Sequence, residues 1–197
     1  ELLIKGVQTI YVDDDTSRRM WWASLEVIQK EFLSLNYQQE GIWVASPLPA
    51  LNDKKIFNQL RGWLWSPEGF PYFQKENASF LPVNHSAKIN KNLDFVSNFK
   101  VLNLSKNDGY EPFLMIITTN FQCILTIVGE KDKKILLMKC DKDSLKVAIE
   151  LIHTKLNQEN YDEGVKFRDA IQNLGDLNFN DQFETNFWPI LSAKLAK

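Results

Sequence analysis

Few side chains in this chain are of the types that perform nucleophilic or acid–base catalysis. Its 197 residues include two histidines, His85 and His153, and two cysteines, Cys123 and Cys140. Catalysis by such groups needs a nucleophile, a base and an orienting partner held close together. Neither histidine has a zinc-binding spacing such as H-E-x-x-H, and each is more simply explained as a surface or boundary residue. The sequence therefore predicts no catalytic residue and no metal site, and the chain is not expected to be an enzyme.

Two further motifs could bind ions or transfer electrons. Cys123 and Cys140 could form a redox pair, or one of them could attach a chromophore, but a buried strand cysteine explains Cys123 better. The triplet Asp13, Asp14 and Asp15 could hold Mg²⁺ or Ca²⁺. Consecutive carboxylates cannot all point at one ion, however, so helix capping is the preferred interpretation. Because no G-x-G-x-x-G or Walker-type glycine motif occurs, nucleotide hydrolysis by those routes is excluded and no cofactor is indicated.

The densest aromatic segment is WLWSPEGFPYF, at residues 63–73. Its first part is predicted to end a helix that begins near Asn52 and stops before Pro67, because proline disfavours helical geometry in the preceding residue. Trp63 fits the buried face of that helix. Four aromatic residues past its end could line an apolar pocket or a partner surface, or could simply fill the core: Trp65, Phe70, Tyr72 and Phe73.

A second candidate surface lies in the segment RRMWW, at residues 18–22. Its arginines could stack a guanidinium on an indole or present a cation to an acidic ligand. The alternative is the start of an amphipathic helix with Trp21 inward and the arginines in solvent, which the spacing of the apolar residues favours. Arg18 and Trp22 are therefore further candidates for ligand or partner binding.

Composition restricts the partners and the compartment. The net charge is −2, and 23 basic residues are mixed with 25 acidic ones, so no broad basic field favours nucleic acid. No apolar run reaches the ~18 to 20 residues that span a bilayer. Two cysteines without a secretory signal are typical of a reduced, intracellular chain, and we expect a cytoplasmic protein. The first residue is Glu1, which suggests a piece of a longer protein.

Hydrophobic periodicity predicts an α/β (α+β) fold. The strongest β signal is an antiparallel meander over 113–118, 121–128 and 134–139, and Asp141 is expected to cap the helix after it. Other expected elements are a strand at 8–12, a helix after the Asp triplet, strands at 42–45 and 99–104, and two C-terminal helices that include Pro189. Residues 69–98 are expected to form a long loop or lid. We expect a central, mainly antiparallel sheet with flanking helices in residues 1–157, and a helical extension in residues 158–197 packed on it.

The order of these elements resembles a known group of sensors. The aromatic helix end at 63–71, the loop after it and the meander FLMIITTNFQCIL at 113–125, running into the helix capped by Asp141, look like the amino-terminal sensory region of cyanobacterial two-component histidine kinases, of the DICT-type or GAF-like group. The resemblance covers most of the chain. It implies a GAF/PAS-like domain that senses a small ligand, light, redox state or a partner protein and signals to an attached or cognate histidine kinase module. No phosphoacceptor motif surrounds His153, so the kinase half is not in this chain.

These observations lead to one leading expectation and two rivals. We expect a non-catalytic sensory or regulatory input domain for signal transduction, with C-terminal helices available for homodimerisation or output. The first rival is a protein-binding scaffold or assembly factor with an exposed aromatic patch over residues 65–73. A concave cluster there would favour a ligand sensor, and a flat exposed patch would favour the scaffold. The second rival, an unrecognised enzyme, would require His85 to gather with at least two of four charged residues: Asp13, Asp108, Arg18 and Arg61.

Overall fold

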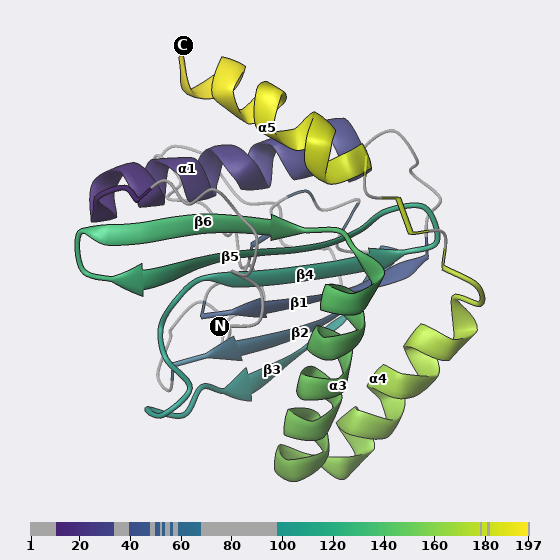
Figure 1. Ribbon diagram of the computed structural model, residues 1–197. Helices are drawn as coiled ribbons and strands as arrows, with labels where there is room; N and C mark the ends of the chain where they lie inside the picture. Colours follow the sequence, from purple (N-terminus) through teal and green to yellow (C-terminus); the bar gives the residue numbers. More distant parts are fainter. Residues whose placement is uncertain are drawn as a thin grey trace, which may run out of the picture.

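The computed structural model describes residues 11–33, 40–47, 50–51, 53, 56, 59–67, 98–177, 179–180 and 182–196. Helices and strands both occur throughout these ranges (Figure 1), which confirms the α/β class. In chain order the elements are α1 (Asp14–Val27), the π-helix η2 (Ile28–Leu33), β1 (Gly41–Ser46), β2 (Leu60–Ser66), β3 (Phe99–Asn103), β4 (Phe113–Thr118), β5 (Gln122–Glu130), β6 (Lys133–Lys139), α3 (Lys142–Glu159), α4 (Tyr161–Asn173) and α5 (Gln182–Leu195).

The strands form one six-stranded sheet in the order β3-β2-β1-β4-β5-β6 (Figure 1). The predicted meander is present as the antiparallel strands β4, β5 and β6, and β4 also runs antiparallel to β1. By contrast, β1, β2 and β3 are mutually parallel. Three of these five pairings are antiparallel, as expected, but the parallel half of the sheet was not predicted.

The largest difference from the prediction concerns Leu60–Ser66. This segment is strand β2 and not the end of a helix. It lies between β1 and β3 and is buried on both faces. A strand of this kind has apolar residues at nearly every position, without the alternation of a half-exposed strand. Some of these residues therefore also fit the spacing of an apolar helix face. Gly62 is unfavourable inside a helix but fits the strand, because the ring of Trp43 on β1 occupies the space that a side chain at 62 would need. The prediction of a helix through Leu64 was therefore wrong.

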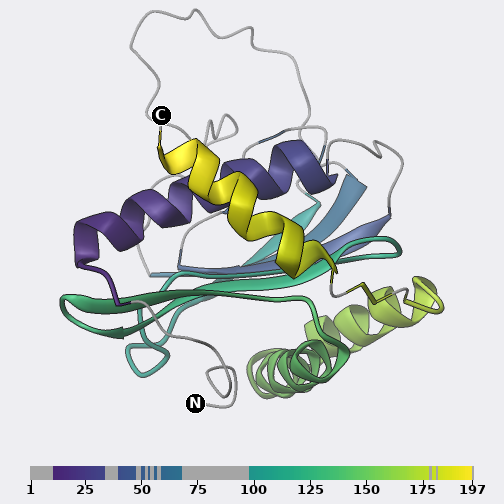
Figure 2. The same cartoon turned by 45° about the horizontal axis from the view of Figure 1, so that its top comes forward.

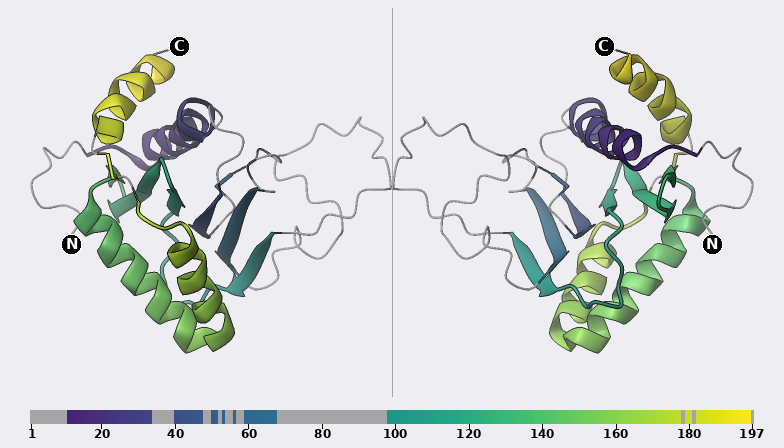
Figure 3. Two further views of the ribbon diagram at one scale, coloured as in Figure 1. Left: turned by 90° about the vertical axis from the view of Figure 1, so that its right-hand side faces the viewer. Right: turned by 90° about the vertical axis from the view of Figure 1, so that its left-hand side faces the viewer.

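Helices cover both faces of the sheet, as the views in Figures 2 and 3 show. α1 and α5 pack together on one face, and α3 and α4 pack together on the other. Successive strand residues point to opposite faces and so enter different cores. Trp43 and Leu64 belong to the core under α1 and α5, whereas Val44 and Trp63 belong to the core under α3 and α4. The molecule is thus a three-layer α/β/α arrangement.

The helix starts agree with the prediction. Asp13 is the N-cap of α1, and its carboxylate accepts a hydrogen bond from the backbone N–H of Thr16 at 2.6 Å. Asp141 caps α3 in the same way through Ser144 at 2.8 Å. In both cases a carboxylate also lies at the positive end of the helix dipole. Pro189 does not split the last helix, because α5 continues through it.

Some predictions fall on residues that the structure does not describe. Of the strand expected at 8–12, the described residue Val12 forms an isolated bridge with Lys134 of β6. The loop expected at 69–98 lies outside the described residues except for its last position. The boundary expected after residue 157 falls inside α3, and the division into two parts stays a prediction. Among the described helices, none has the length and apolar character of a membrane span.

Candidate functional site

The corner between α3 and α4 is built on a single residue, Asn160. Its backbone N–H donates to the carbonyl of Leu156 at the end of α3, at 2.7 Å. Its side-chain oxygen accepts from the backbone N–H of Glu163 in the first turn of α4, at 3.3 Å. One extended residue therefore ends one helix and starts the next. This places Glu159, the last residue of α3, and Glu163 on either side of the corner.

Two tryptophans of β2 hold this corner against the sheet. Trp63 Nε1 donates to Glu163 Oε2 at 3.0 Å, and Trp65 Nε1 donates to Glu159 Oε2 at 2.7 Å. The two indoles share one face of the strand because they are two residues apart. We call these four residues the indole–carboxylate cluster. Trp63 is thus hydrogen-bonded to α4, and Trp65 is hydrogen-bonded to α3.

A lysine of α3 completes the half of the cluster around Trp65. Lys155 Nζ lies 2.7 Å from Asp108 Oδ1 and 2.8 Å from Glu159 Oε1, and 5.8 Å from the centre of the Trp65 ring. Burial opposes the charge on Lys155, but its bonds to the two carboxylates outweigh burial and raise its pKa above 10.5. The hydrogen bond from Lys155 in turn is the main cause that lowers the pKa of Asp108 below 3.8.

In the half of the indole–carboxylate cluster around Trp63, the carboxylate of Glu163 is more deeply buried than that of Glu159. The side chain of Glu163 is only 8% exposed, and its Oε1 lies 2.8 Å from Lys166 Nζ. Burial disfavours its charged form, but hydrogen bonds from Lys166 and Trp63, with the charges of Lys166 and Lys100, outweigh burial. The pKa of Glu163 is therefore lowered from 4.5. Ionised Glu163 is the state that the folded chain stabilises.

This arrangement predicts acid sensitivity. Glu163 and Asp108 bind protons more weakly in the folded than in the unfolded chain, so their contribution to stability is complete above their unfolded pKa values of about 4.5 and 3.8. It is lost as the pH falls through the lower folded values. Urea midpoints measured between pH 6 and pH 3 should therefore decrease, and less steeply in Glu163→Gln. The amide of that variant can still accept from Trp63, so at pH 6 it should cost only about 1 kcal/mol.

The control for this pH series is Glu150→Gln, at an exposed position of α3. This variant should keep the acid dependence of the unsubstituted chain. Equal pH slopes for Glu163→Gln and the unsubstituted chain would contradict the assignment.

Of the aromatic residues that the sequence grouped as a site at 65–73, the structure describes Trp65. Trp65 is 3% exposed, lies inside β2 and is bonded to Glu159, so it does not stand on an open surface. The described residues do not include Phe70, Tyr72 or Phe73, nor His85. Whether residues 65–73 form a pocket or a patch stays untested, except that Trp65 belongs to the core.

The structure does bring Arg18 and Trp22 together on one side of α1, one helical turn apart. The side chain of Arg18 is 70% exposed and Trp22 is 51% exposed. Arg18 also lies 3.9 Å from Asp15, an exposed pair that contributes little to stability. As predicted, Trp21 is the inward indole of this segment, at 7% exposure.

The remaining chemical candidates have ordinary structural surroundings. Within the described ranges no group of three or more metal-ligating side chains gathers. Cys123 and Cys140 are both buried and neither forms a disulfide, and burial is the main cause that raises the pKa of Cys123 well above 9.0. The ring of His153 is hydrogen-bonded through Nε2 to the side-chain amide of Asn157 at 3.0 Å. The burial of Cys123 and the half-buried position of His153 agree with the interpretations preferred from the sequence.

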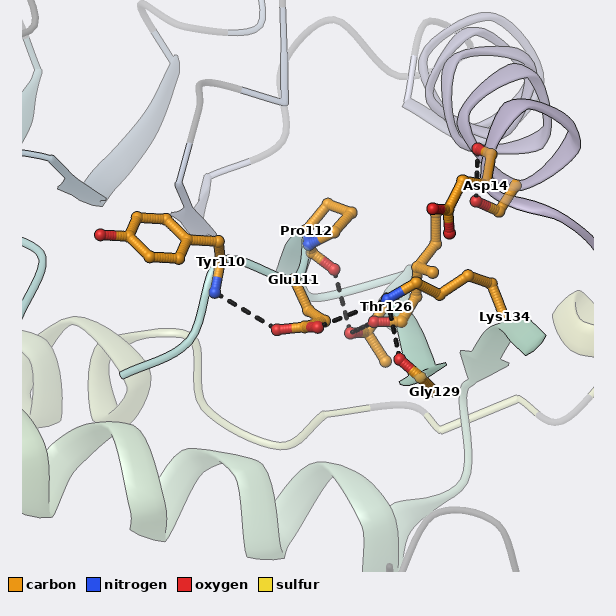
Figure 4. Close-up of polar contacts among 9 residues, drawn as sticks. Asp14, Tyr110, Glu111, Pro112, Thr126, Gly129 and Lys134 are labelled. Carbon is orange, nitrogen blue, oxygen red and sulfur yellow. Dashed lines mark hydrogen bonds and ion pairs between the residues drawn. The ribbon is translucent and has the colours of Figure 1, made fainter. Parts of the chain in front are cut away.

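A second polar cluster fastens the loop before β4 to the β5–β6 hairpin (Figure 4). Lys134 Nζ donates to the carbonyl of Gly129 at 2.7 Å and lies 3.5 Å from Glu111 Oε1. Thr126 donates through its hydroxyl to the carbonyl of Pro112 at 3.0 Å. These bonds join segments of the chain to each other, which is the arrangement of a structural anchor.

Sequence reasoning missed the acidic half of the indole–carboxylate cluster. Two signals were available: tryptophans two residues apart are typical of a strand, and Glu159 and Glu163 flank a helix-capping asparagine. Nothing local, however, connects them, because the bonded partners lie 94 and 100 residues apart in the chain.

Comparison with known proteins places the chain in a family but does not assign an activity. No curated protein and no solved structure matches it. Its full length, residues 1–197, matches a family described as a domain of unknown function, DUF8628. The chain therefore belongs to the DUF8628 family.

Proposed function

We propose that this domain is a non-catalytic sensory or regulatory input domain that signals to an attached or cognate histidine kinase through its α3–α4 corner. The observation that carries the proposal is the pair of bonds from Trp63 and Trp65 to Glu163 and Glu159. Leaving a buried polar group without a partner costs about 1–3 kcal/mol. A shift of β2 relative to the corner would break one or both bonds, so the strand and the two helices move together. A ligand or partner that displaces β2 would thereby displace the corner.

The test uses the full reading frame that contains this chain. We expect that frame, or a neighbouring gene, to encode a histidine kinase module, whose autophosphorylation is then measured. Trp65→Phe removes the indole donor to Glu159 and should change the basal rate several-fold. The control is Tyr11→Phe, at an exposed position before α1, which should leave the rate unchanged. If no kinase is found, or if both variants behave like the unsubstituted protein, the proposal is wrong.

A scaffold role is the second candidate, and one observation on α3 and α4 supports it. Three large apolar side chains are exposed there: Val147 at 38%, Leu151 at 66% and Tyr161 at 70%. Val147 and Leu151 are one turn apart and so lie on the same side of α3. Sedimentation analysis distinguishes the two roles. A scaffold or a homodimer formed through this side should lose its complex in Leu151→Glu, whereas the kinase response should persist if the corner alone signals.

A further inference from the structure

Positive charge gathers beside Trp63, at the β3 edge of the sheet. Lys100 on β3 is the direct neighbour of Trp63 in the parallel register, and Arg61 precedes Trp63 by two residues on β2. All three side chains therefore point to the same face of the sheet. Lys166 reaches the same place from α4, through its bond to Glu163. Cations from three different elements thus surround one buried indole.

The carboxylate of Glu163 does not neutralise all three of these cations. Glu163 already accepts from Trp63 and lies 2.8 Å from Lys166. Lys100 acts on Glu163 through its charge, without an ion pair, and within the described part of the chain no carboxylate lies within 4 Å of Arg61 or Lys100. Among the described residues Arg61, Lys100, Lys166 and Glu163, positive charge exceeds negative charge. This contrasts with the formal net charge of −2 for the whole chain.

Arg61 and Lys166 are also held in place before any ligand arrives. The guanidinium carbon of Arg61 lies 5.4 Å from the centre of the Trp63 ring. Trp63 itself is fully buried and packs edge-on against Phe167 at 5.3 Å. A side chain stacked on a fixed ring loses less entropy on binding. The first turn of α4, which contains Glu163, adds the positive end of a helix dipole.

We propose that Arg61, Lys100 and Lys166 form a binding site for the phosphate or carboxylate group of a small anionic molecule. Arginine presents a planar fork of donors that matches such oxyanions, and the two lysines add charge. An anion bound here competes with Glu163 for Lys166 and so acts directly on the indole–carboxylate cluster. In this respect the inference rests on the proposed sensory function, because it names the class of ligand that would be sensed.

The test follows the indole N–H resonance of Trp63 in ¹⁵N NMR spectra of the whole chain at low ionic strength. Inorganic phosphate is titrated in one arm and citrate in another, which separates the two oxyanion sources. The Trp63 resonance should shift and saturate in at least one arm, and that of Trp188, on α5 at the other face of the sheet, should not. The double variant Arg61→Gln/Lys100→Gln should bind the anion at least about tenfold more weakly, as expected for the loss of a charge-assisted hydrogen bond. The matched control, Lys146→Gln, removes one exposed charge of α3 and should bind normally.

Three results would overturn the site. Sodium chloride at matched ionic strength could shift the Trp63 resonance as far as phosphate does, which would indicate screening only. The double variant, shown to be folded by its other tryptophan resonances, could titrate like the unsubstituted chain. Polyglutamate could bind where phosphate and citrate do not, which would assign the surface to an acidic protein segment. Because none of these measurements involves a kinase, failure of the anion site is distinct from failure of the proposed sensory function.

Discussion

Gly62→Ala is expected to lower the free energy of unfolding by about 3 kcal/mol or more, as severe overpacking of a core does. A Cβ atom at position 62 would lie 2.2 Å from Cε2 and 2.4 Å from Cζ2 of Trp43 on the neighbouring strand. Trp43 is fully buried and its ring packs against Phe99 at 5.5 Å, so it cannot swing into solvent. Relief of the clash requires β1 and β2 to separate in the middle of the sheet.

Urea denaturation followed by far-ultraviolet circular dichroism measures this effect. Gly175→Ala is the matched control, because a Cβ there meets no atom within 4 Å although φ is +68°. Its cost should be only the backbone strain of about 1–2 kcal/mol. Equal midpoints for the two variants would show that β1 and β2 are not packed as described.

Trp63→Phe is expected to destabilise the chain by about 2–3 kcal/mol. Part of this is the loss of the hydrogen bond to the nearly buried Glu163, and part is the cavity left by the smaller ring. Trp65→Phe should cost less, about 1 kcal/mol. The reason is that the side chain of Glu159 is 29% exposed and can turn to water when its indole donor is removed.

A double-mutant cycle isolates the bond itself. Trp63→Phe combined with Glu163→Ala, which removes the acceptor that a glutamine would keep, should show a coupling energy of at least about 0.5 kcal/mol in urea denaturation. The cycle of Trp63→Phe with Glu150→Ala, on the exposed side of α3, should show none within error. Additive effects in the first cycle would mean that Trp63 acts through its volume alone.

The features that were predictable from the sequence are those determined by local interactions. Asp13 and Asp141 cap their helices through N–H groups only three residues away. The meander pairs strands that follow one another, so alternating apolar residues and short turns were sufficient to place it. Cys123 is buried in β5, as its interpretation as a strand residue implied.

The parallel half of the sheet and the site were not predictable in this way. β2 is buried on both faces and therefore lacks the alternation that identifies a half-exposed strand. Its apolar residues also fit a helical period, and against a helix stood Gly62 and the spacing of Trp63 and Trp65 by two residues. The carboxylates that accept the indole hydrogen bonds lie at the α3–α4 corner, 94 and 100 residues after the tryptophans in the sequence. Their pairing depends on how α3 and α4 pack on the sheet, which no local pattern of residues contains.

β1 can complete its pairing only after the ribosome has made β4, because the register joins Gly41 to Thr118 and Ser46 to Phe113. The pairings within the meander, in contrast, join strands that follow one another in the sequence, and we expect them to form first during refolding. Until β4 exists, the apolar residues of β1 lack their antiparallel neighbour and can pair with other chains. During synthesis this central strand is therefore exposed to aggregation until β4 has been made.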